Sequence, residues 1–507
     1  MPVALRDLIV ADSLNLLPES ALGGNWSDIT ITGVTDDSRQ IKPGHLFVAR
    51  SGFKFNGHDF IPQALANGAA AILTDRTAAS PLTVPVLVTS QLASVAGKMA
   101  HRFWGDPSQK MRVMAVTGTN GKTTIAYLTR SLFAAMGVRC GLIGTVEIDD
   151  GVSRMPSPMT TPGAIELAGL LAIMHRNGLG AVAMEASSHA LDQDRLAGVQ
   201  VGVGMFSNLT GDHLDYHVTM ERYAAAKARL FTGLAPSAWA VVNADDDYAS
   251  TMVRQTQAHI MTYGLKRKAD LTGVVVRMDQ SGMQMKVSLR GGHPLDVRSP
   301  MVGLHNAQNI LCALAGAVAA GFPLERLVAA VSQAKAAPGR LERVGLPEAA
   351  GEKMPFAVFV DYAHTHDALE NVLGALRPLT AGRLICVFGC GGDRDKTKRP
   401  LMGAVAEKLA DCIIITSDNP RTEKPDAIIG DILKGVSSES GEKVRVLADR
   451  KTAIAAAVEM AQRGDTILVA GKGHENYQII GNDRHHFDDV ECASQALELK
   501  LCGACDR

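Results

Sequence analysis

Residues 113–124 read Val-Met-Ala-Val-Thr-Gly-Thr-Asn-Gly-Lys-Thr-Thr. The apolar run at 113–116 predicts a short buried strand. Apolar residues at helical spacing follow at Ile125, Leu128 and Leu132, so a helix is expected directly after the glycines. The stretch therefore predicts a strand, a tight loop and a helix in immediate succession.

This loop has the composition of a phosphate-binding turn. Backbone N–H groups can surround a phosphate only where no Cβ intrudes, which explains Gly118 and Gly121, and the following helix adds its positive N-terminal end. Lys122 is then expected to reach the terminal phosphates of a nucleotide, with the Thr123 hydroxyl on Mg²⁺. The usual nucleotide loop has glycine where this chain has Val116, so an ordinary glycine turn is the alternative.

Length and composition limit the class of protein. The 507 residues predict three domains of an α/β protein, which we place at 1–107, 108–338 and 339–507. The 51 basic and 52 acidic residues nearly cancel, so neither a nucleic acid nor a membrane is an expected partner, and small molecules are. We expect a cytoplasmic monomer, since no signal segment or membrane span is found.

The eight cysteines form no disulfide framework. Several lie within apolar runs, as Cys386 does, which is typical of reduced core thiols. Cys502 and Cys505 make one C-x-x-C pair without a second pair or a histidine cluster, so a metal site there is not favoured.

The first segment, 1–107, alternates predicted strands at 29–32, 46–49, 70–73 and 84–88 with a helix at 60–66. Two of its loops, at 36–39 and 52–57, combine hydroxyl, cationic and aromatic side chains. They suit a phosphorylated ligand that carries a ring, and ordinary polar turns are the alternative.

The second segment, 108–338, places polar residues where predicted parallel strands end. Glu185 follows the strand 181–184, at the edge where open parallel sheets bind ligands, although an exposed loop carboxylate is the alternative. His213 lies in a loop with two aspartates and a second histidine, which could ligate a metal or move protons. Lys227 lies on the side of its helix that carries Tyr223 and Leu230, so it should face inward; the residue pattern alone favours snorkelling to solvent.

The third segment, 339–507, predicts further strands that end in charged loops. Arg394, Arg421 and Glu475 follow three of these strands on one expected rim. Two guanidinium groups and a carboxylate suit an amino acid that bears an extra carboxylate, and a surface salt-bridge cluster is the alternative. No G-x-G-x-x-G sequence is present, which disfavours a dinucleotide site.

Together these stretches closely resemble the Mur ligase family, which adds amino acids to the peptidoglycan precursor. Gly118 to Thr124 is similar to the family's Gly-Thr-x-Gly-Lys-Thr loop, which explains Val116. The stretches 391–394, 418–421 and 471–475 resemble the pattern of members that add meso-diaminopimelate. The resemblance implies a small N-terminal α/β uridine-binding domain, a central P-loop-type ATPase domain with a mostly parallel sheet, and a C-terminal Rossmann-like α/β domain.

The resemblance also implies the reaction: ATP phosphorylates the D-glutamate side-chain carboxylate of a UDP-N-acetylmuramoyl dipeptide, and the amine of diaminopimelate attacks the acyl phosphate to form an amide. ATP and Mg²⁺ are the implied cofactors. The implied catalytic residues are Lys122, Glu185, His213 and Lys227, the last as a carbamate, and the metal would be held by Thr123, Glu185, His213 and the Lys227 carbamate.

The implied binding residues fall into three groups. ATP would contact Gly118, Thr119, Asn120, Gly121, Lys122, Thr123, Thr124, Asn306, Arg340 and Asp361. The UDP precursor would contact Ser38, Phe53, Lys54, Phe55, Thr160, Thr161, Ser187, Gln193 and Arg195. Diaminopimelate would contact Arg394, Asp418, Asn419, Pro420, Arg421, Gly471 and Glu475. One departure is Met159, where members of this type often have asparagine.

Two other functions are the alternatives to an amide ligase of peptidoglycan synthesis. A folate-type (folylpolyglutamate) ligase shares the phosphate loop and the modified lysine but lacks the uridine-binding type of domain and the Asp-Asn-Pro-Arg sequence at 418–421. A non-catalytic ATP-binding switch or transport motor would not need the arginine and glutamate rim of the third segment.

Overall fold

The protein is described by a computed structural model covering residues 2–9, 16, 26–52, 56–77, 82–334, 336–345, 355–437 and 441–505, with side chains to residue 501. The chain divides into two compact units. The first comprises 1–272, 289–291 and 309–327, and the second comprises 273–288, 292–308 and 328–507. In the described ranges no helix is both long and apolar enough to cross a membrane.

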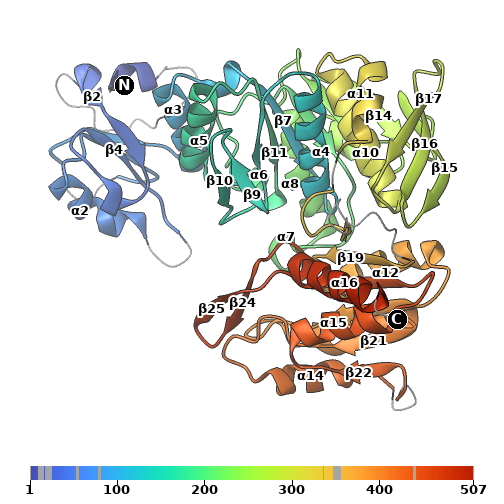
Figure 1. Ribbon diagram of the computed structural model, residues 1–507. Coiled ribbons are helices and arrows are strands. Elements are labelled where there is room, and N and C mark those ends of the chain that lie inside the picture. Colours follow the sequence, from blue (N-terminus) through green and yellow to red (C-terminus); the bar gives the residue numbers. More distant parts are fainter. Residues whose placement is uncertain are drawn as a thin grey trace. The chain divides into compact units, whose positions relative to one another are not determined.

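The N-terminal part of the first unit contains a small parallel sheet with the strand order β3-β4-β5-β6 (Figure 1). Alternating residues of its strands face two different cores: Leu46 and Val48 pack with the long helix of this part, and Phe47 with its short helix. The elements are β1 (Val3–Ala4), α1 (Leu5–Leu8), β2 (Thr30–Ile31), β3 (Gly33–Thr35), β4 (His45–Ala49), α2 (Ile61–Ala66), β5 (Ala71–Thr74), β6 (Val86–Val88) and α3 (Leu92–Phe103).

A large, mostly parallel sheet follows, with β7 in its middle and the order β10-β9-β8-β11-β7-β12-β13-β14. Only β9 and β10 run antiparallel to their neighbours in this series. The elements are β7 (Arg112–Thr117), α4 (Lys122–Ala135), β8 (Cys140–Ile143), β9 (Glu147–Asp149), β10 (Arg154–Pro156), α5 (Ala164–Arg176), β11 (Ala181–Glu185), α6 (Ser188–Asp192), β12 (Val203–Phe206), α7 (Leu214–His217), α8 (Met220–Thr232), β13 (Trp239–Asn243), α9 (Ala249–Val253) and β14 (His259–Gly264).

The chain then passes through β15 (Leu271–Asp279), β16 (Gly282–Leu289), β17 (Leu295–Ser299), α10 (Leu304–Ala319) and α11 (Leu324–Val331). β15 begins by pairing parallel to β14 at Tyr263 and Gly264, and β16 pairs antiparallel to β17.

The second unit is built on a six-stranded sheet with the order β18-β19-β23-β20-β21-β22, parallel except for β18. The elements are β18 (Glu342–Arg343), β19 (Ala357–Asp361), α12 (His366–Leu376), β20 (Leu384–Phe388), α13 (Lys398–Leu409), β21 (Cys412–Ile415), α14 (Pro425–Leu433), β22 (Val444–Val446), α15 (Arg450–Met460), β23 (Thr466–Ala470), β24 (Tyr477–Ile480), β25 (Asp483–His486) and α16 (Asp489–Cys505).

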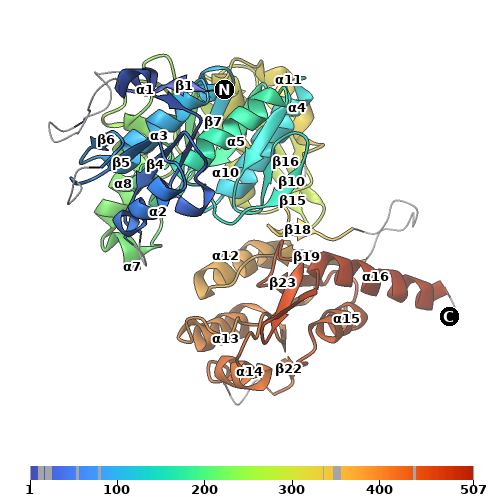
Figure 2. The same cartoon turned by 90° about the vertical axis from the view of Figure 1, so that its left-hand side faces the viewer.

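Helices cover both faces of this sheet. Leu384, Cys386 and Phe388 of β20 pack into the core that α12, α13 and α14 cover, whereas Ile385 and Val387 pack into the core beneath α15 and α16. Figure 2 shows the two helix groups on opposite sides of the strands. Strands buried on both faces read as continuous apolar runs, which is why they were recognisable from sequence.

Candidate active site

The predicted phosphate loop joins β7 to α4 at the carboxyl end of the central sheet. Gly121 precedes α4 with a φ of 87°, in the left-handed region. A Cβ on Gly118 would lie 1.9 Å from the hydroxyl oxygen of Ser207. Both glycines are therefore required by this turn, in which backbone N–H groups at the start of α4 can bind an anion.

Residues that follow β12 form hydrogen bonds with the phosphate loop. The Ser207 hydroxyl donates to the carbonyl of Asn120 at 2.6 Å, and the Asn208 side-chain oxygen accepts from the Asn120 N–H at 3.0 Å. The Thr119 N–H donates to the Asn208 carbonyl at 2.8 Å. Nothing in the sequence pattern indicates a role for Ser207 and Asn208, because only the pairing of β12 with β7 brings them to the phosphate loop.

Lys122 is directed at its own loop. Its ammonium group donates to the carbonyls of Gly118 at 2.9 Å and Thr119 at 2.8 Å. Thr123 and Thr124 are buried in the first turn of α4. The cation and the two hydroxyl groups thus lie at one helix N-terminus, where a polyphosphate could be held.

Lys227 lies inside the molecule on α8. Its side chain is 1% exposed, and its nitrogen donates to the Gly118 carbonyl at 2.8 Å and lies 4.3 Å from the centre of the Tyr223 ring. Burial, reinforced by the positive charge of Lys122, holds its pKa well below the usual value. The snorkelling favoured by the residue pattern is wrong, because the amine finds a backbone carbonyl within the fold.

Glu185 ends β11 and is buried. One carboxylate oxygen accepts from the Thr145 N–H at 2.8 Å, and the other accepts from the Thr145 hydroxyl at 3.0 Å. The alternative of an exposed loop carboxylate is therefore wrong. The Glu185 carboxylate can approach Thr145 this closely only because residue 144 is glycine, where a Cβ would lie 2.5 Å from the carboxylate.

Three predicted precursor-binding residues gather around Glu185. Thr160 shares a hydrogen bond with the Thr145 hydroxyl at 3.1 Å, and the Thr161 hydroxyl donates to the Glu185 carbonyl at 2.8 Å. The Ser187 N–H donates to the Thr161 hydroxyl at 3.2 Å. The hydroxyl groups therefore form one polar cluster beside the carboxylate.

Arg195 and Gln193 extend this cluster. The Arg195 guanidinium donates to the Gln193 side-chain oxygen at 2.8 Å and to the Thr161 carbonyl at 2.9 Å. It also lies 3.4 Å from the Met159 sulfur. The sequence departure at Met159 thus lies directly against a predicted precursor contact.

Ser38 is buried in the N-terminal part and donates its hydroxyl to the Gln63 side-chain oxygen at 2.8 Å. The other predicted uridine-side residues, Phe53, Lys54 and Phe55, lie outside the described residues.

His213 adopts a left-handed backbone conformation before α7, and its ring lies edge-on to His189 at 4.9 Å between centres. Across the part of the chain that the structure describes, no group of three or more His, Cys, Asp or Glu residues is arranged to hold a metal ion. A metal in this unit would need other oxygen donors as well. The Thr123 hydroxyl, a modified lysine and bound phosphates are such donors, and Mg²⁺ typically uses one or two carboxylates plus phosphate and water.

In the second unit, Arg421 and Arg394 both lie beside Gly391. A Cβ there would be 3.0 Å from a guanidinium nitrogen of Arg421 and 3.8 Å from Cγ of Arg394. Arg421 has a φ of 52° and donates through its side chain to the Gly392 carbonyl at 2.8 Å.

The loops after β20 and β21 are joined by further contacts. The Gly392 N–H donates to the Asn419 carbonyl at 2.9 Å, and a Cβ on Gly392 would lie 1.9 Å from the Pro420 carbonyl oxygen. Arg399, fully buried on α13, pairs with Glu423 at 2.8 Å and with Asp431 at 3.0 Å. Arg394 and Arg421 thus lie in two loops that are joined by a hydrogen bond and an ion pair.

Asp418, Asn419, Gly471 and Glu475 come together at the same end of the sheet. The Asn419 amide donates to a Glu475 carboxylate oxygen at 2.9 Å. Gly471 has a φ of 114°, and a Cβ there would lie 2.7 Å from the Asp418 carboxylate. β20, β21 and β23 are parallel neighbours, so their following loops meet at one edge.

Lys472 is a site residue that the sequence pattern did not indicate. Its side chain is fully buried, with its nitrogen 3.3 Å from the Asn419 side-chain oxygen and 3.6 Å from the Glu475 carboxylate. It lies within the stretch 471–475, but a lysine between glycines in a loop gives no signal of burial.

Asn306, Arg340 and Asp361 also lie in the second unit. The Asn306 amide donates to the Val302 carbonyl at 2.8 Å. Asp361 accepts from the N–H groups of Leu341 and Ala363 at 2.7 and 2.8 Å, and burial raises its pKa. The Arg340 guanidinium lies over the Tyr362 ring at 4.8 Å.

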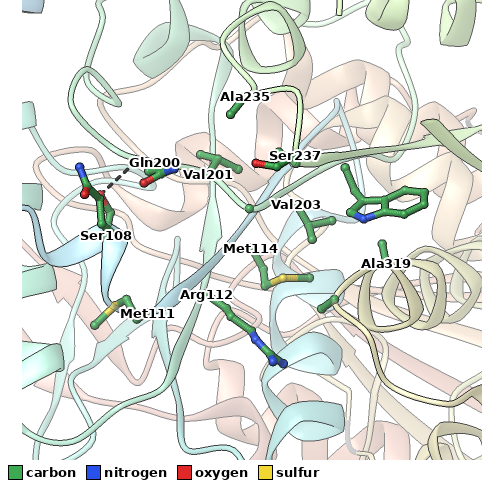
Figure 3. A pocket seen from close by; sticks show the side chains of 15 residues that line it. Ser108, Met111, Arg112, Met114, Gln200, Val201, Val203, Ala235, Ser237 and Ala319 are labelled. Carbon is green, nitrogen blue, oxygen red and sulfur yellow. Dashed lines mark hydrogen bonds between the residues drawn. The ribbon is translucent and has the colours of Figure 1, made fainter. Parts of the chain in front are cut away.

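A separate cavity of about 320 Å³ lies at the opposite end of the central strands (Figure 3). Arg112 and Val203, which begin β7 and β12, line it together with Trp239, the first residue of β13. The phosphate loop follows the other end of β7, so this cavity is distinct from it.

Comparison with known proteins assigns the chain to a class. Family models match three consecutive stretches: the Mur ligase family catalytic domain at 30–104, the Mur ligase middle domain at 116–317 and the Mur ligase glutamate ligase domain at 339–473. The chain belongs to the Mur ligase family. This confirms the predicted three-domain α/β fold with a mostly parallel central sheet, whereas the boundaries at 107 and 338 stay predictions.

The chain also shows similarity to one particular kind of enzyme within this family. The chain is 44% identical, over 97% of its length and 98% of the relative, to the "UDP-N-acetylmuramoyl-L-alanyl-D-glutamate--2,6-diaminopimelate ligase" of Synechococcus elongatus. A solved structure with the same enzyme name is 36% identical with a TM-score of 0.74, covering 99% of this chain and 100% of that one.

More distant solved structures share only the fold. A MurF ligase of Thermotoga maritima in complex with ADP is 19% identical, with a TM-score of 0.60 over 93% of this chain and 98% of that one. A folylpolyglutamate synthase of Mycobacterium tuberculosis is 18% identical, with a TM-score of 0.56 over 78% of this chain and 92% of that one.

Proposed function

We propose that this enzyme uses ATP to join diaminopimelate to the D-glutamate side-chain carboxylate of UDP-N-acetylmuramoyl-L-alanyl-D-glutamate. The observation that carries the proposal is the pair of arginines, Arg394 and Arg421, which lie beside Gly391 in hydrogen-bonded loops. These loops follow the same edge of the sheet as the buried Asp418 carboxylate and the partly buried Glu475 carboxylate. Near-full-length similarity to relatives with this printed name supports the same reaction.

The reaction proceeds in two balanced steps. An oxygen of the D-glutamate carboxylate attacks the terminal phosphorus of ATP, and the bond to the ADP oxygen breaks, leaving an acyl phosphate. The amine nitrogen then attacks the acyl carbon, the bond from carbon to the phosphate oxygen breaks, and a nitrogen proton is released. Negative charge is spread over the oxygens of the transferring phosphoryl group and builds up on the leaving ADP oxygen, so cationic groups near them lower the barrier.

The phosphate loop and its neighbours in the first unit fit the phosphate side of ATP in this chemistry. The backbone from Gly118 to Thr124 would hold the phosphates, and Lys122 would exchange its loop carbonyls for phosphate oxygens. Asn306, Arg340 and Asp361 are proposed as further nucleotide contacts. Thr123, Glu185, His213 and a Lys227 carbamate would hold Mg²⁺, which neutralises phosphoryl charge when bound.

Lys227 suits carbamylation. A lowered pKa leaves the amine neutral at a lower pH than an exposed lysine, and only the neutral amine attacks CO₂. In this step the N–C bond forms, one C=O π bond of CO₂ opens to place a negative charge on oxygen, and the nitrogen releases one proton. The product is a carbamate anion, which can bind a cation.

The UDP precursor would lie against Ser38 and the polar cluster of Thr160, Thr161, Ser187, Gln193 and Arg195, in which Arg195 supplies the positive charge. Contacts from Phe53, Lys54 and Phe55 remain a prediction.

Besides its reacting amine, diaminopimelate carries one further ammonium group and two carboxylates, and we expect it to bind through that ammonium group and the distal carboxylate. Arg394 and Arg421 suit the distal carboxylate, and Asp418, Asn419 and Glu475 suit the ammonium group, with Pro420 and Gly471 shaping the loops. Lysine lacks the distal carboxylate, so Arg421 is the residue expected to discriminate against it.

The test measures phosphate release from ATP with the UDP-muramyl dipeptide, alone and with diaminopimelate or lysine, followed by the mass of the product. We expect release that depends on the dipeptide and on diaminopimelate, and a product carrying one diaminopimelate. Release without any amino acid would favour an ATP-binding switch, and product formation only with a folate acceptor would favour the folate-type ligase. A monomeric, cytoplasmic state is also a prediction.

A further inference from the structure

We infer that Lys472 is a positioning residue for the incoming amino acid: it orients Asn419 and Glu475, and its one positive charge offsets only part of the charge of the two carboxylates beside it. The inference rests on the proposed function, because it concerns the site proposed for diaminopimelate. Lys472 follows Gly471 after β23, and its side chain is fully buried.

The buried ammonium group has three polar neighbours. Its nitrogen lies 3.3 Å from the Asn419 side-chain oxygen, 3.6 Å from the Glu475 carboxylate and 4.0 Å from the Asp418 carboxylate. It also lies 5.4 Å from the centre of the Tyr477 ring. A buried cation is stable only with such partners. The position of Lys472 and the positions of Asn419, Glu475 and Asp418 therefore depend on one another.

The contacts define which way the Asn419 amide points. Its oxygen accepts from the Ile479 N–H at 2.9 Å and faces Lys472, so the NH₂ group must point to the other side. There it donates to Glu475 at 2.9 Å. Lys472 and the Ile479 N–H therefore together fix the amide orientation that holds the Glu475 carboxylate.

The same amide connects the ammonium site to Arg421. Ile479 belongs to β24, and its carbonyl accepts from the Arg421 N–H at 3.0 Å. The Arg421 carbonyl in turn accepts from the Gly481 N–H at 2.7 Å. The β24–β25 hairpin thus supports the left-handed backbone of Arg421, and Asn419 fastens the hairpin to the residues around Lys472.

Charge balance explains why a ligand ammonium group fits. Asp418 and Glu475 supply two negative charges, and Lys472, the cation near both, supplies one positive charge. Arg394 and Arg421 are left out of this count because the proposed function assigns them to the distal carboxylate. The nearby Arg450 is paired with Asp489 at 2.7 Å, both fully buried, so that pair adds no net charge. The ammonium group of an amino acid would complete the balance.

The experiment compares the Michaelis constants of wild type and Lys472→Met for all three substrates. We expect the KM for diaminopimelate to rise by about 30-fold or more, the effect of leaving one partner of a buried charge cluster unpaired. The KM values for ATP and the UDP-muramyl dipeptide should change by less than about twofold, since those sites use other residues. Lys472→Gln keeps a donor near Asn419, and should act in the same direction if the Met variant does not fold.

Lys500→Met is the matched control. It removes the same side chain from the same unit, but its ammonium group donates to the carbonyls of Val458, Glu459 and Ala461 and not to the cluster. We expect its kinetic constants to equal those of wild type. An unchanged KM for diaminopimelate in Lys472→Met, or an equal rise in all three KM values, would overturn the inference. Failure of wild type to ligate diaminopimelate would instead contradict the proposed function.

Discussion

Lys227 and Lys472 are among the largest side chains that the fold buries completely. Desolvation lowers the pKa of both, because burial disfavours the charged form. Their partners differ: Lys227 has a carbonyl, an aromatic ring and the positive charge of Lys122 nearby, whereas Lys472 has two carboxylates. Lys227 is therefore suited to react as a neutral amine, and Lys472 to remain an ammonium group.

The first residue-scale prediction concerns Arg421. Arg421→Ala should cost about 2 to 5 kcal/mol of diaminopimelate binding, the range for truncating one partner of a buried charge pair. Steady-state kinetics with varied diaminopimelate measure the effect. Arg445→Ala, at an exposed arginine of β22 in the same unit, is the control. An unaltered KM and rate in Arg421→Ala would remove the assignment.

The second residue-scale prediction concerns Lys227. With ¹³C-bicarbonate, wild type should show a carbamate carbon signal that Lys227→Ala lacks. The signal should strengthen as pH rises through the lowered pKa, because the neutral amine becomes more abundant. Lys408→Ala, at an exposed lysine paired with Glu370, should keep the signal. A wild-type spectrum without a Lys227-dependent signal would contradict carbamylation.

At the scale of elements, the β7–α4 connection depends on a backbone that passes close to the β12 loop. Gly118→Ala would place a Cβ 1.9 Å from the Ser207 hydroxyl and displace the phosphate loop. We expect at least about a tenfold loss of nucleotide affinity, as for misplaced anion-binding N–H groups, measured by calorimetry with ADP. Gly137→Ala is the matched control, since its φ is 78° but nothing lies within 4 Å of the added Cβ. Equal ADP affinity in both variants would argue against this phosphate site.

Helices α15 and α16 are joined by a fully buried ion pair. Arg450 donates to both oxygens of Asp489 at 2.7 Å and to the Ala470 carbonyl at 2.9 Å. Arg450→Ala should lower the free energy of unfolding by about 3 to 5 kcal/mol, because Asp489 would remain charged and buried. Denaturant titration measures it. Lys408→Ala, which breaks an exposed pair, should cost only about 0 to 1 kcal/mol, and a similar small loss for Arg450→Ala would disprove the argument.

At the scale of the whole molecule, the residues proposed for the UDP precursor and those proposed for diaminopimelate fall in different compact units. The precursor residues lie in the first unit, and the diaminopimelate residues lie in the second. Hydrogen exchange should therefore show protection at 160–161 and 187–195 with the UDP-muramyl dipeptide, and at 391–394, 418–423 and 471–481 with diaminopimelate. A ligand at 100 times its Kd should stabilise the protein by about 2.7 kcal/mol. Protection of 160–161 and 187–195 by diaminopimelate alone would contradict this division.

The sequence by itself determined the α/β class, the strand, loop and helix around Gly118, and the strand ends that carry Glu185, Arg421 and Glu475. Those features are local, because glycine spacing and apolar periodicity act over a few neighbouring residues. It predicted that Arg394, Arg421 and Glu475 follow strands on one rim, but the contacts between their loops depend on which strands become neighbours.

Only the tertiary structure decided what surrounds each buried polar group. The residue pattern alone favoured snorkelling for Lys227, yet its buried nitrogen donates a hydrogen bond to the Gly118 carbonyl, 109 positions away. Lys472 gave no signal in the sequence, and its partner Asn419 is 53 positions distant. The physical reason is desolvation: a buried charge requires partners at hydrogen-bonding distance, and the folded chain takes them from segments far apart in sequence.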